Sequence, residues 1–234
     1  MSTGYVFAPP ARVSAAVKGS ENRFPVRRIF CVGRNYADHV REMGGDPRSE
    51  PPIFFTKPAD ALVPGGADVP YPPATRDLHH EVELVVALQH GGMRIATSTA
   101  LSHVYGYAVG NDLTRRDLQA QAKSRGQPWD MAKGFDASAQ IARIHPVEQF
   151  GHPSTNAIWL KVNGKQRQHS TLDQMIWSVP EIISGLSALV ELQPGDLIYT
   201  GTPDGVGPLV PGDVVTAGIE GLDELEFRIA AVPA

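Results

Sequence analysis

Cysteine, excess positive charge and long apolar runs are all scarce in this sequence of 234 residues. Its one cysteine, Cys31, cannot form an internal disulfide, which fits a reducing, cytoplasmic location. A net charge of -4 lacks the basic excess of proteins that bind nucleic acid or anionic membranes. No segment approaches the roughly 20 apolar residues of a membrane span, and residues 1–25 lack the apolar stretch of an export signal. We therefore expect neither a nucleic-acid partner nor a membrane partner.

Glycine and proline, by contrast, are abundant, with Gly 23 and Pro 20 spread through the chain. Turn residues at many separate points favour numerous short strands over a helical bundle. Asn163-Gly164 predicts a tight hairpin because this pair accepts two positive φ values, and residues 178–180 predict the start of an amphipathic helix. Residues 1–25 carry no strong pattern and are expected to form an irregular lead-in.

Two acidic side chains interrupt an otherwise apolar, β-branched run over residues 78–86. Side chains alternate along a strand, so Glu81 and Glu83 are expected on the same face. Two like charges there repel each other, and a divalent cation would compensate them. Taken alone, the pair is more typical of an edge strand with a solvated acidic face, so the metal interpretation depends on the other motifs.

A third carboxylate follows the strand predicted at residues 104–109. Thr114 and Asp117 resemble a helix capping box, and Gly126 ends the predicted helix, so Asp117 already has a structural role. Asp112 has no such local role. It is therefore the better candidate for a metal ligand.

A possible acid–base pair lies in the segment after the strand at residues 26–32. On a short helical turn, His39 and Glu42 would be neighbours three residues apart. A carboxylate beside an imidazole orients the ring and raises its basicity, as a general base requires. The alternative is a surface helix with a solvated histidine. Because the surrounding segment is polar, residues 36–52 are also a candidate lid.

Two lysines lie in apolar company. Lys57 ends the aromatic strand predicted at residues 53–57 and is either a contact for a substrate anion or an ordinary charge at a strand end. Lys133 lies among Trp129, Met131 and Phe135, where a lysine needs a partner anion or a lowered pKa. A structural lysine that extends its amine to solvent is an equally good interpretation of Lys133.

The glycine-rich loop at residues 200–208 lacks the Lys-Ser/Thr pair of a nucleotide-binding loop and does not open a helix. Its backbone amides and the Thr202 hydroxyl could hold a carboxylate or an oxyanion instead.

Six motifs, in order, resemble the fumarylacetoacetate hydrolase family: GRNYADHVREMG, FFTKP, LHHEVELVV, GYAVGNDLTRRDLQ, PWDMAKGFD and PGDLIYTGTPDGVGP. The resemblance extends from about residue 26 to the C-terminus. Within the family, the chain is most similar to the short acylpyruvases, among them bacterial fumarylpyruvate hydrolases of the gentisate route of aromatic degradation.

The resemblance implies an α+β, mainly β fold, a mixed β-sandwich roll, with residues 26–234 as one catalytic domain. It also implies a homodimer with one Mg²⁺ or Mn²⁺ per subunit. The larger enzyme that names the family has a further carboxylate ligand, which residues 33–35 do not offer, so more positions on the metal should be open. The residues carried over are, as metal ligands, Glu81, Glu83 and Asp112; as catalytic residues, His39, Glu42 and Lys133; and as substrate contacts, Arg34, Lys57, Arg116, Gln119 and Thr202.

The expected reaction is hydrolysis of a 2,4-dioxo acid, fumarylpyruvate, to fumarate and pyruvate. Three carboxylates leave about half of an octahedral shell free for a 2-oxo acid. Related alternatives are decarboxylation of oxaloacetate and isomerisation or decarboxylation of 2-hydroxyhepta-2,4-diene-1,7-dioate. A non-catalytic β-domain is the alternative of a different class.

Overall fold

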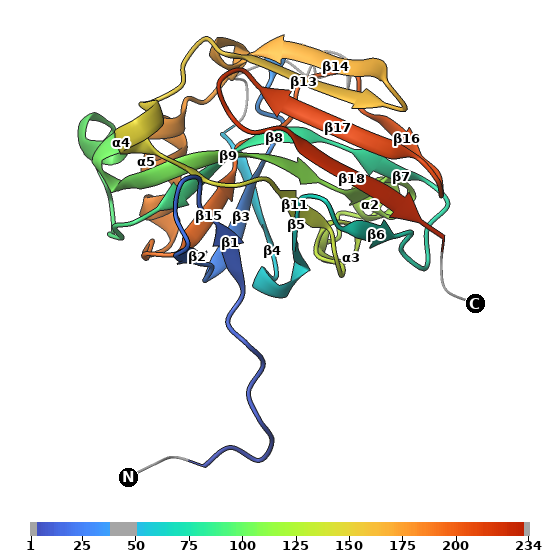
Figure 1. The fold of residues 1–234 in the computed structure, drawn as a ribbon, viewed down its shortest axis with the longest axis horizontal. Helices are drawn as coiled ribbons and strands as arrows, with labels where there is room; N and C mark the ends of the chain where they lie inside the picture. The colour runs from blue at the N-terminus through green and yellow to red at the C-terminus, as the bar shows by residue number, and fades with distance from the viewer. Residues whose placement is uncertain (1–3, 38–50, 232–234) are drawn as a thin grey trace.

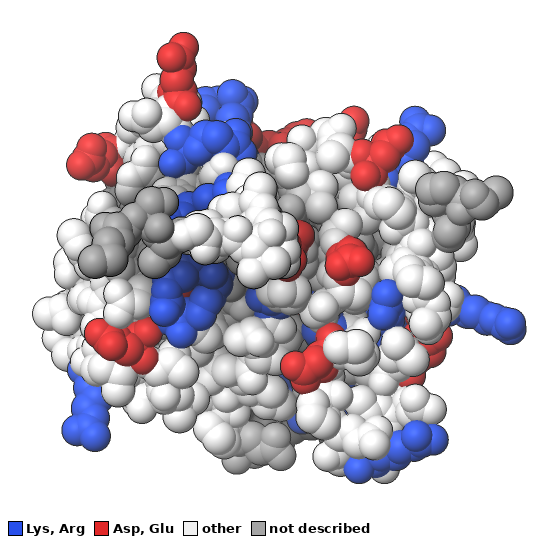
Figure 2. All heavy atoms as spheres, turned by 90° about the horizontal axis from the view of Figure 1, so that it is seen from below, with Lys and Arg blue, Asp and Glu red and all other residues white. Residues whose placement is uncertain are grey.

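The computed structural model describes residues 4–37 and 51–231. The chain folds mainly into strands, with few helices, and the N-terminal segment extends away from the folded body (Figure 1). In the described part of the chain, none of the helices has the length and apolar character needed to cross a membrane. Basic and acidic side chains are interspersed on the face shown in Figure 2.

The larger sheet is mixed and has the order β4-β3-β15-β8-β9-β11-β5, with β12 also paired to β9. Its strands are β3 (Arg28–Gly33), β4 (Ile53–Lys57), β5 (Leu62–Pro64), β8 (Val82–Leu88), β9 (Val104–Asp112), β11 (Ala139–Ile141), β12 (His145–Pro146) and β15 (Asp196–Tyr199). Strand β8 lies between β15 and β9, and all its residues are buried. A central strand covered on both faces explains why the sequence there is an almost continuous apolar run.

A second sheet, β14-β13-β17-β18-β6, packs on one face of the first (Figure 1). Its strands are β6 (Asp68–Pro70), β13 (Ala157–Val162), β14 (Lys165–Thr171), β17 (Val214–Ile219) and β18 (Leu225–Ala230). Val82, Leu84 and Val86 of β8 share a core cluster with side chains of this sheet, whereas Val85 and Ala87 belong to a cluster on the opposite face. This alternation confirms the predicted mixed β-sandwich.

Two smaller sheets complete the fold. One joins β10 (Thr114–Arg115), β7 (Leu78–His80) and β16 (Gly207–Leu209), and the other joins β1 (Ser14–Ala16) to β2 (Arg23–Pro25). The acidic strand is therefore divided at Glu81 into two strands of different sheets. The lead-in also differs from expectation, because Ala15 and Phe24 pack into the second core cluster.

The helices are α2 (Arg116–Ser124), α3 (Asp130–Lys133), α4 (Val147–Phe150) and α5 (Val179–Leu189), with 3₁₀ turns η1 (Ala59–Ala61), η2 (Thr97–His103) and η3 (Leu172–Gln174). Helix α5 begins at the predicted position, and a capping box of Ser178 and Glu181 stabilises its start. The predicted cap of α2 is wrong: the helix begins at Arg116, and Asp117 instead accepts hydrogen bonds from the Thr75 hydroxyl (2.6 Å) and the Arg76 amide (3.0 Å). The hairpin at Asn163 (φ 51°) is confirmed.

Candidate active site

Three buried carboxylates converge where β8 meets β9. The antiparallel register pairs Val82 with Asn111, and the Asp112 amide donates to the Glu81 carbonyl at 2.8 Å, so Glu81 and Asp112 face each other across the strands. Glu83 lies two residues beyond Glu81 and is opposite Gly110. Each of the three side chains offers one oxygen, and these oxygens lie within 4.8 Å of one another.

Hydrogen bonds fix the backbone at Glu81 and the carboxylate of Glu83. The Glu81 amide donates to the Asn111 side chain at 3.0 Å, which is where the strand breaks and turns toward the smaller sheet. The Gly201 amide donates to the Glu83 carboxylate at 2.8 Å. Gly201 has a φ of 99°, and a Cβ there would lie 2.6 Å from the Cβ of Asn35, so this turn requires glycine.

Three cations lie beside the three carboxylates and form ion pairs with two of them, Glu81 and Asp112. The Lys133 amine lies 2.6 Å from Glu81 and 2.7 Å from Asp112. The Arg116 guanidinium lies 2.5 Å from Glu81, and the Lys57 amine lies 2.7 Å from Asp112. A divalent ion added to this balanced set would leave an excess of positive charge, which suits a dianionic ligand.

Electrostatics at Glu83 favour a cation. Burial, followed by the neighbouring charges of Asp112 and Glu81, raises the pKa of Glu83 well above its ordinary value. Burial by itself would lower the pKa of Lys133, but Asp112 and Glu81 outweigh it and raise this pKa. Carboxylate oxygens are the donors that Mg²⁺ takes in proteins and that also suit Mn²⁺, so the residues present fit such an ion.

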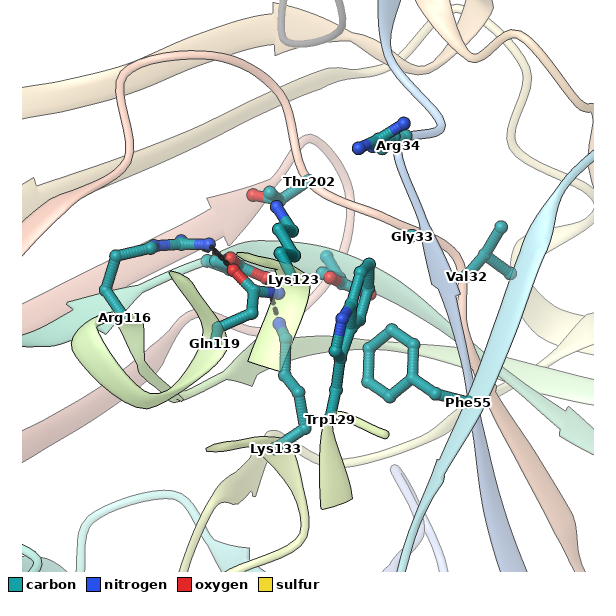
Figure 3. Close-up of a pocket in the computed structure, with 12 residues that line it drawn as sticks. Val32, Gly33, Arg34, Phe55, Arg116, Gln119, Lys123, Trp129, Lys133 and Thr202 are labelled. Atoms are coloured by element: carbon teal, nitrogen blue, oxygen red, sulfur yellow. Dashed lines mark hydrogen bonds and ion pairs between the residues drawn. The ribbon is translucent and has the colours of Figure 1, made fainter. Parts of the chain in front are cut away.

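The site opens into a pocket lined by most of the predicted residues (Figure 3). Asp112 contacts Lys133 and is not among the residues that line the pocket. His39, Glu42 and most of the candidate lid at 36–52 lie outside the described residues. The predicted residues that line the pocket are Arg34, Glu81, Glu83, Arg116, Gln119, Lys133 and Thr202.

Lys57 differs from both of its predicted interpretations. Its side chain is fully buried, and its amine donates to the carbonyls of Leu113 and Lys133 as well as contacting Asp112. It does not line the pocket. A lysine with three oxygen partners and no access to solvent supports the acidic site from behind, so it is not placed to bind a substrate anion.

Two further groups escaped the sequence analysis. Lys123 and Trp129 line the pocket, the Lys123 amine lies 5.1 Å from the Trp129 ring centroid, and Phe55 packs edge-on against that ring (Figure 3). Burial, followed by the charges of Arg34 and Arg116, lowers the pKa of Lys123 to about 8. The helical spacing of residues 116, 119 and 123 could have revealed this lysine, because all three lie on one face of α2.

A larger cavity of about 440 Å³ adjoins the pocket and shares Phe55, Trp129 and Lys133 with it. Its other walls include Ile53 and Gln127. The space between the pocket side chains themselves is about 30 Å³. A ligand anchored at the carboxylates could therefore extend into the adjoining cavity.

Comparisons with known proteins agree with this arrangement. Residues 28–230 match the family described as fumarylacetoacetate (FAA) hydrolase C-terminal. The mitochondrial oxaloacetate tautomerase FAHD1 of Mus musculus is 45% identical over 203 residues, which cover 87% of this chain and 91% of that protein. A fumarylpyruvate hydrolase from Pseudomonas aeruginosa, in complex with Mn²⁺ and pyruvate, has a TM-score of 0.96 and 51% identity and covers 97% of this chain and 100% of its own.

A more distant structure, a 2-hydroxyhepta-2,4-diene-1,7-dioate isomerase from Mycobacterium marinum, has a TM-score of 0.77 and 32% identity, with 89% of this chain and 77% of that chain covered. Fold and site together define an enzyme of hydrolase or lyase type whose acidic triad can hold a metal ion. The family match identifies the class further: the chain belongs to the fumarylacetoacetate hydrolase family.

Proposed function

We propose that this protein is a hydrolase dependent on Mg²⁺ or Mn²⁺ that cleaves an acylpyruvate, with fumarylpyruvate as the substrate and fumarate and pyruvate as products. The observation that carries the proposal is the buried triad of Glu81, Glu83 and Asp112 at a pocket rich in cations. The likeness to a fumarylpyruvate hydrolase in complex with Mn²⁺ and pyruvate supports it.

The triad would hold the metal, which supplies a Lewis acid for the carboxylate and keto oxygens of a 2-oxo acid. Around it, Arg116 and Gln119 are hydrogen-bonded to each other at 2.7 Å and line the pocket, and we expect them to contact the substrate carboxylate. The Phe55 and Trp129 rings border the larger cavity, which has room for the acyl chain.

The proposed chemistry is a hydrolytic carbon–carbon cleavage. His39, oriented by Glu42, accepts a proton from the water that attacks the ketone on the acyl side. The Lys133 amine or the loop at Thr202 stabilises the oxyanion that forms. Collapse of this oxyanion breaks the bond to the pyruvate methylene carbon and releases fumarate. The pyruvate fragment leaves as an enolate and takes up a proton to become pyruvate.

A second candidate is tautomerisation of oxaloacetate, favoured by the identity to the mouse tautomerase. The two candidates differ in what the pocket must accommodate, because oxaloacetate has four carbons and no acyl chain beyond the 2-oxo acid. The adjoining cavity of about 440 Å³ gives that chain a place and so favours the longer substrate.

The test is turnover by metal-stripped protein with and without added Mn²⁺ or Mg²⁺, using fumarylpyruvate, acetylpyruvate and oxaloacetate in parallel. Metal-dependent release of fumarate from fumarylpyruvate, faster than any conversion of oxaloacetate, is the expected result. Conversion of oxaloacetate alone would replace the hydrolase proposal with the tautomerase or decarboxylase alternative. Equal rates with and without metal would contradict the proposal that the triad holds a metal ion needed for the reaction.

We assign to Lys123 the contact with the second carboxylate of the substrate, because its amine lies over the Trp129 ring, which borders the larger cavity. Replacing Lys123 with glutamine should lower kcat/KM for fumarylpyruvate roughly 10- to 100-fold, because a charge-assisted hydrogen bond is lost. For acetylpyruvate, which has no distal carboxylate, kcat/KM of the variant should stay within about 3-fold of the wild-type value. Because the pKa of Lys123 is lowered to about 8, wild-type kcat/KM for fumarylpyruvate should fall above that pH as the amine loses its charge.

Lys161 is a matched control, since its amine also lies over a tryptophan ring, that of Trp159 at 4.7 Å, away from the site. Lys161→Gln should leave kcat/KM unchanged for both fumarylpyruvate and acetylpyruvate. An equal loss on fumarylpyruvate and acetylpyruvate in Lys123→Gln would contradict the assignment.

A further inference from the structure

The Thr202 hydroxyl is bound from behind by a side chain of the second sheet. Gln168 lies on β14 and is 1% exposed. Its side-chain nitrogen donates to the Thr202 hydroxyl at 2.8 Å and to the Pro203 carbonyl at 2.8 Å. Its side-chain oxygen accepts from the Val82 amide at 3.1 Å and contacts a His80 ring nitrogen at 3.0 Å.

These contacts fix the orientation of the Gln168 amide. The Val82 amide can only donate, so it must face the side-chain oxygen, and the Pro203 carbonyl can only accept, so it must face the nitrogen. Both backbone partners select the same orientation. The Gln168 nitrogen is therefore a donor toward Thr202, and the Thr202 oxygen is an acceptor.

This assignment determines where the hydroxyl hydrogen of Thr202 can point. With its oxygen already accepting from Gln168, the hydroxyl keeps its one hydrogen for another acceptor. Within residues 4–37 and 51–231, no hydrogen bond donated by this hydroxyl is present, and Thr202 lines the pocket beside Glu81 and Glu83.

The loop that carries Thr202 is held on both sides. Before it, the Gly201 amide is bound to Glu83 at 2.8 Å. After it, Gly205 approaches β14 so closely that a Cβ there would lie 2.1 Å from the Arg167 carbonyl. The loop is thus packed between the acidic strand and β14, and these contacts hold Thr202 at the pocket.

We propose that Gln168 is a positioning residue that makes the Thr202 hydroxyl a hydrogen-bond donor to a carboxylate or oxyanion of the bound 2-oxo acid. This inference rests on the proposed function only for the class of ligand. Gln168 does not touch the ligand. It acts through Thr202, by occupying the acceptor side of the hydroxyl before the ligand arrives.

The test measures the dissociation constant of pyruvate by calorimetry on Mn²⁺-loaded protein, with the Mn²⁺ dissociation constant measured separately. Gln168→Glu reverses the direction of the hydrogen bond to Thr202, because a carboxylate accepts the hydroxyl hydrogen instead of donating to the hydroxyl oxygen. We expect it to weaken pyruvate binding roughly 10-fold or more, and Thr202→Val to do the same. The double variant should be no weaker than the worse single variant, because both remove one interaction.

Thr202→Ser should bind pyruvate within about 3-fold of wild type, and Gln166→Glu, an exposed residue of the same strand, should have no effect. Mn²⁺ affinity should be unchanged throughout, which a general structural role would not predict. Wild-type affinity for pyruvate in Gln168→Glu, or losses that multiply in the double variant, would overturn the positioning role.

Neutron diffraction from the wild-type complex with Mn²⁺ and pyruvate provides a test that does not depend on variants folding. The deuterium on Thr202 should point toward a pyruvate oxygen, and a deuterium pointing toward Gln168 would overturn the inference. If wild-type protein bound no pyruvate at all, the proposed function would fail along with the inference. Normal pyruvate binding in Gln168→Glu would overturn the inference alone.

Discussion

Glu83→Gln is expected to lose on the order of 10³-fold in metal-dependent turnover while remaining at least as stable as the wild type without metal. Loss of the negative charge on this proposed ligand lowers the affinity for the metal ion. The effect on stability has the opposite direction, because burial and the charges of Asp112 and Glu81 raise the pKa of Glu83, which means that the folded protein disfavours its ionised form. A neutral amide removes that cost and can still accept from Gly201.

The effect on stability should also depend on pH. An acid whose folded-state pKa is raised destabilises the fold once pH rises above its ordinary value of 4.5. The thermal midpoint of Glu83→Gln relative to metal-free wild type should therefore increase as pH rises above that value. Glu226→Gln, on an exposed position of β18, is the matched control for both measurements. A variant with full activity, or one less stable than the wild type at neutral pH, would contradict this account.

Lys133→Met is the second change with a large expected effect. The Lys133 amine contacts both Glu81 and Asp112 and lines the pocket, so its removal takes away both a buried cation and the proposed oxyanion donor. We expect kcat to fall roughly 10²- to 10³-fold. Metal-free protein should also lose about 3–5 kcal/mol of stability, because the one buried cation that contacts both Glu81 and Asp112 is gone and Arg116 and Lys57 alone must compensate them.

Metal should recover most of that stability, since a divalent ion compensates the same carboxylates, whereas kcat should not recover. Thermal melts of the variant with and without Mn²⁺, beside single-turnover rates, separate the two effects. Recovery of kcat at saturating metal would show that Lys133 serves only to balance charge.

Local rules in the sequence single out the three carboxylates, and the family resemblance joins them into one predicted metal site. Alternation along an extended chain predicts that Glu81 and Glu83 lie on one face, and Asp112 stands out because the sequence gives it no local capping role. The division of the strand at Glu81 could not be predicted, since it depends on the side chain of Asn111, 30 residues away. Burial on both faces likewise makes β8 an apolar run that hides its periodicity.

Lys57 and Gln168 show more clearly which features could not be predicted from the sequence. Lys57 ends an apolar strand, and nothing in the sequence indicates that this end points inward to Asp112 instead of outward to solvent. Gln168 lies in a polar hairpin strand whose neighbours are exposed, and its partners are 34 and 86 residues distant in the chain. Their roles depend on how two sheets pack, which local patterning does not specify.

The central claim, that the reaction is hydrolysis at the acyl carbon, is tested most directly by turnover of fumarylpyruvate in ¹⁸O-labelled water with Mn²⁺-loaded protein. Attack by water followed by carbon–carbon cleavage places one solvent oxygen in the new carboxylate of fumarate, which mass spectrometry detects. The account predicts fumarate carrying a single ¹⁸O, formed in equal amount to pyruvate. Consumption of the substrate with no labelled fumarate would contradict it and would favour a tautomerase or decarboxylase.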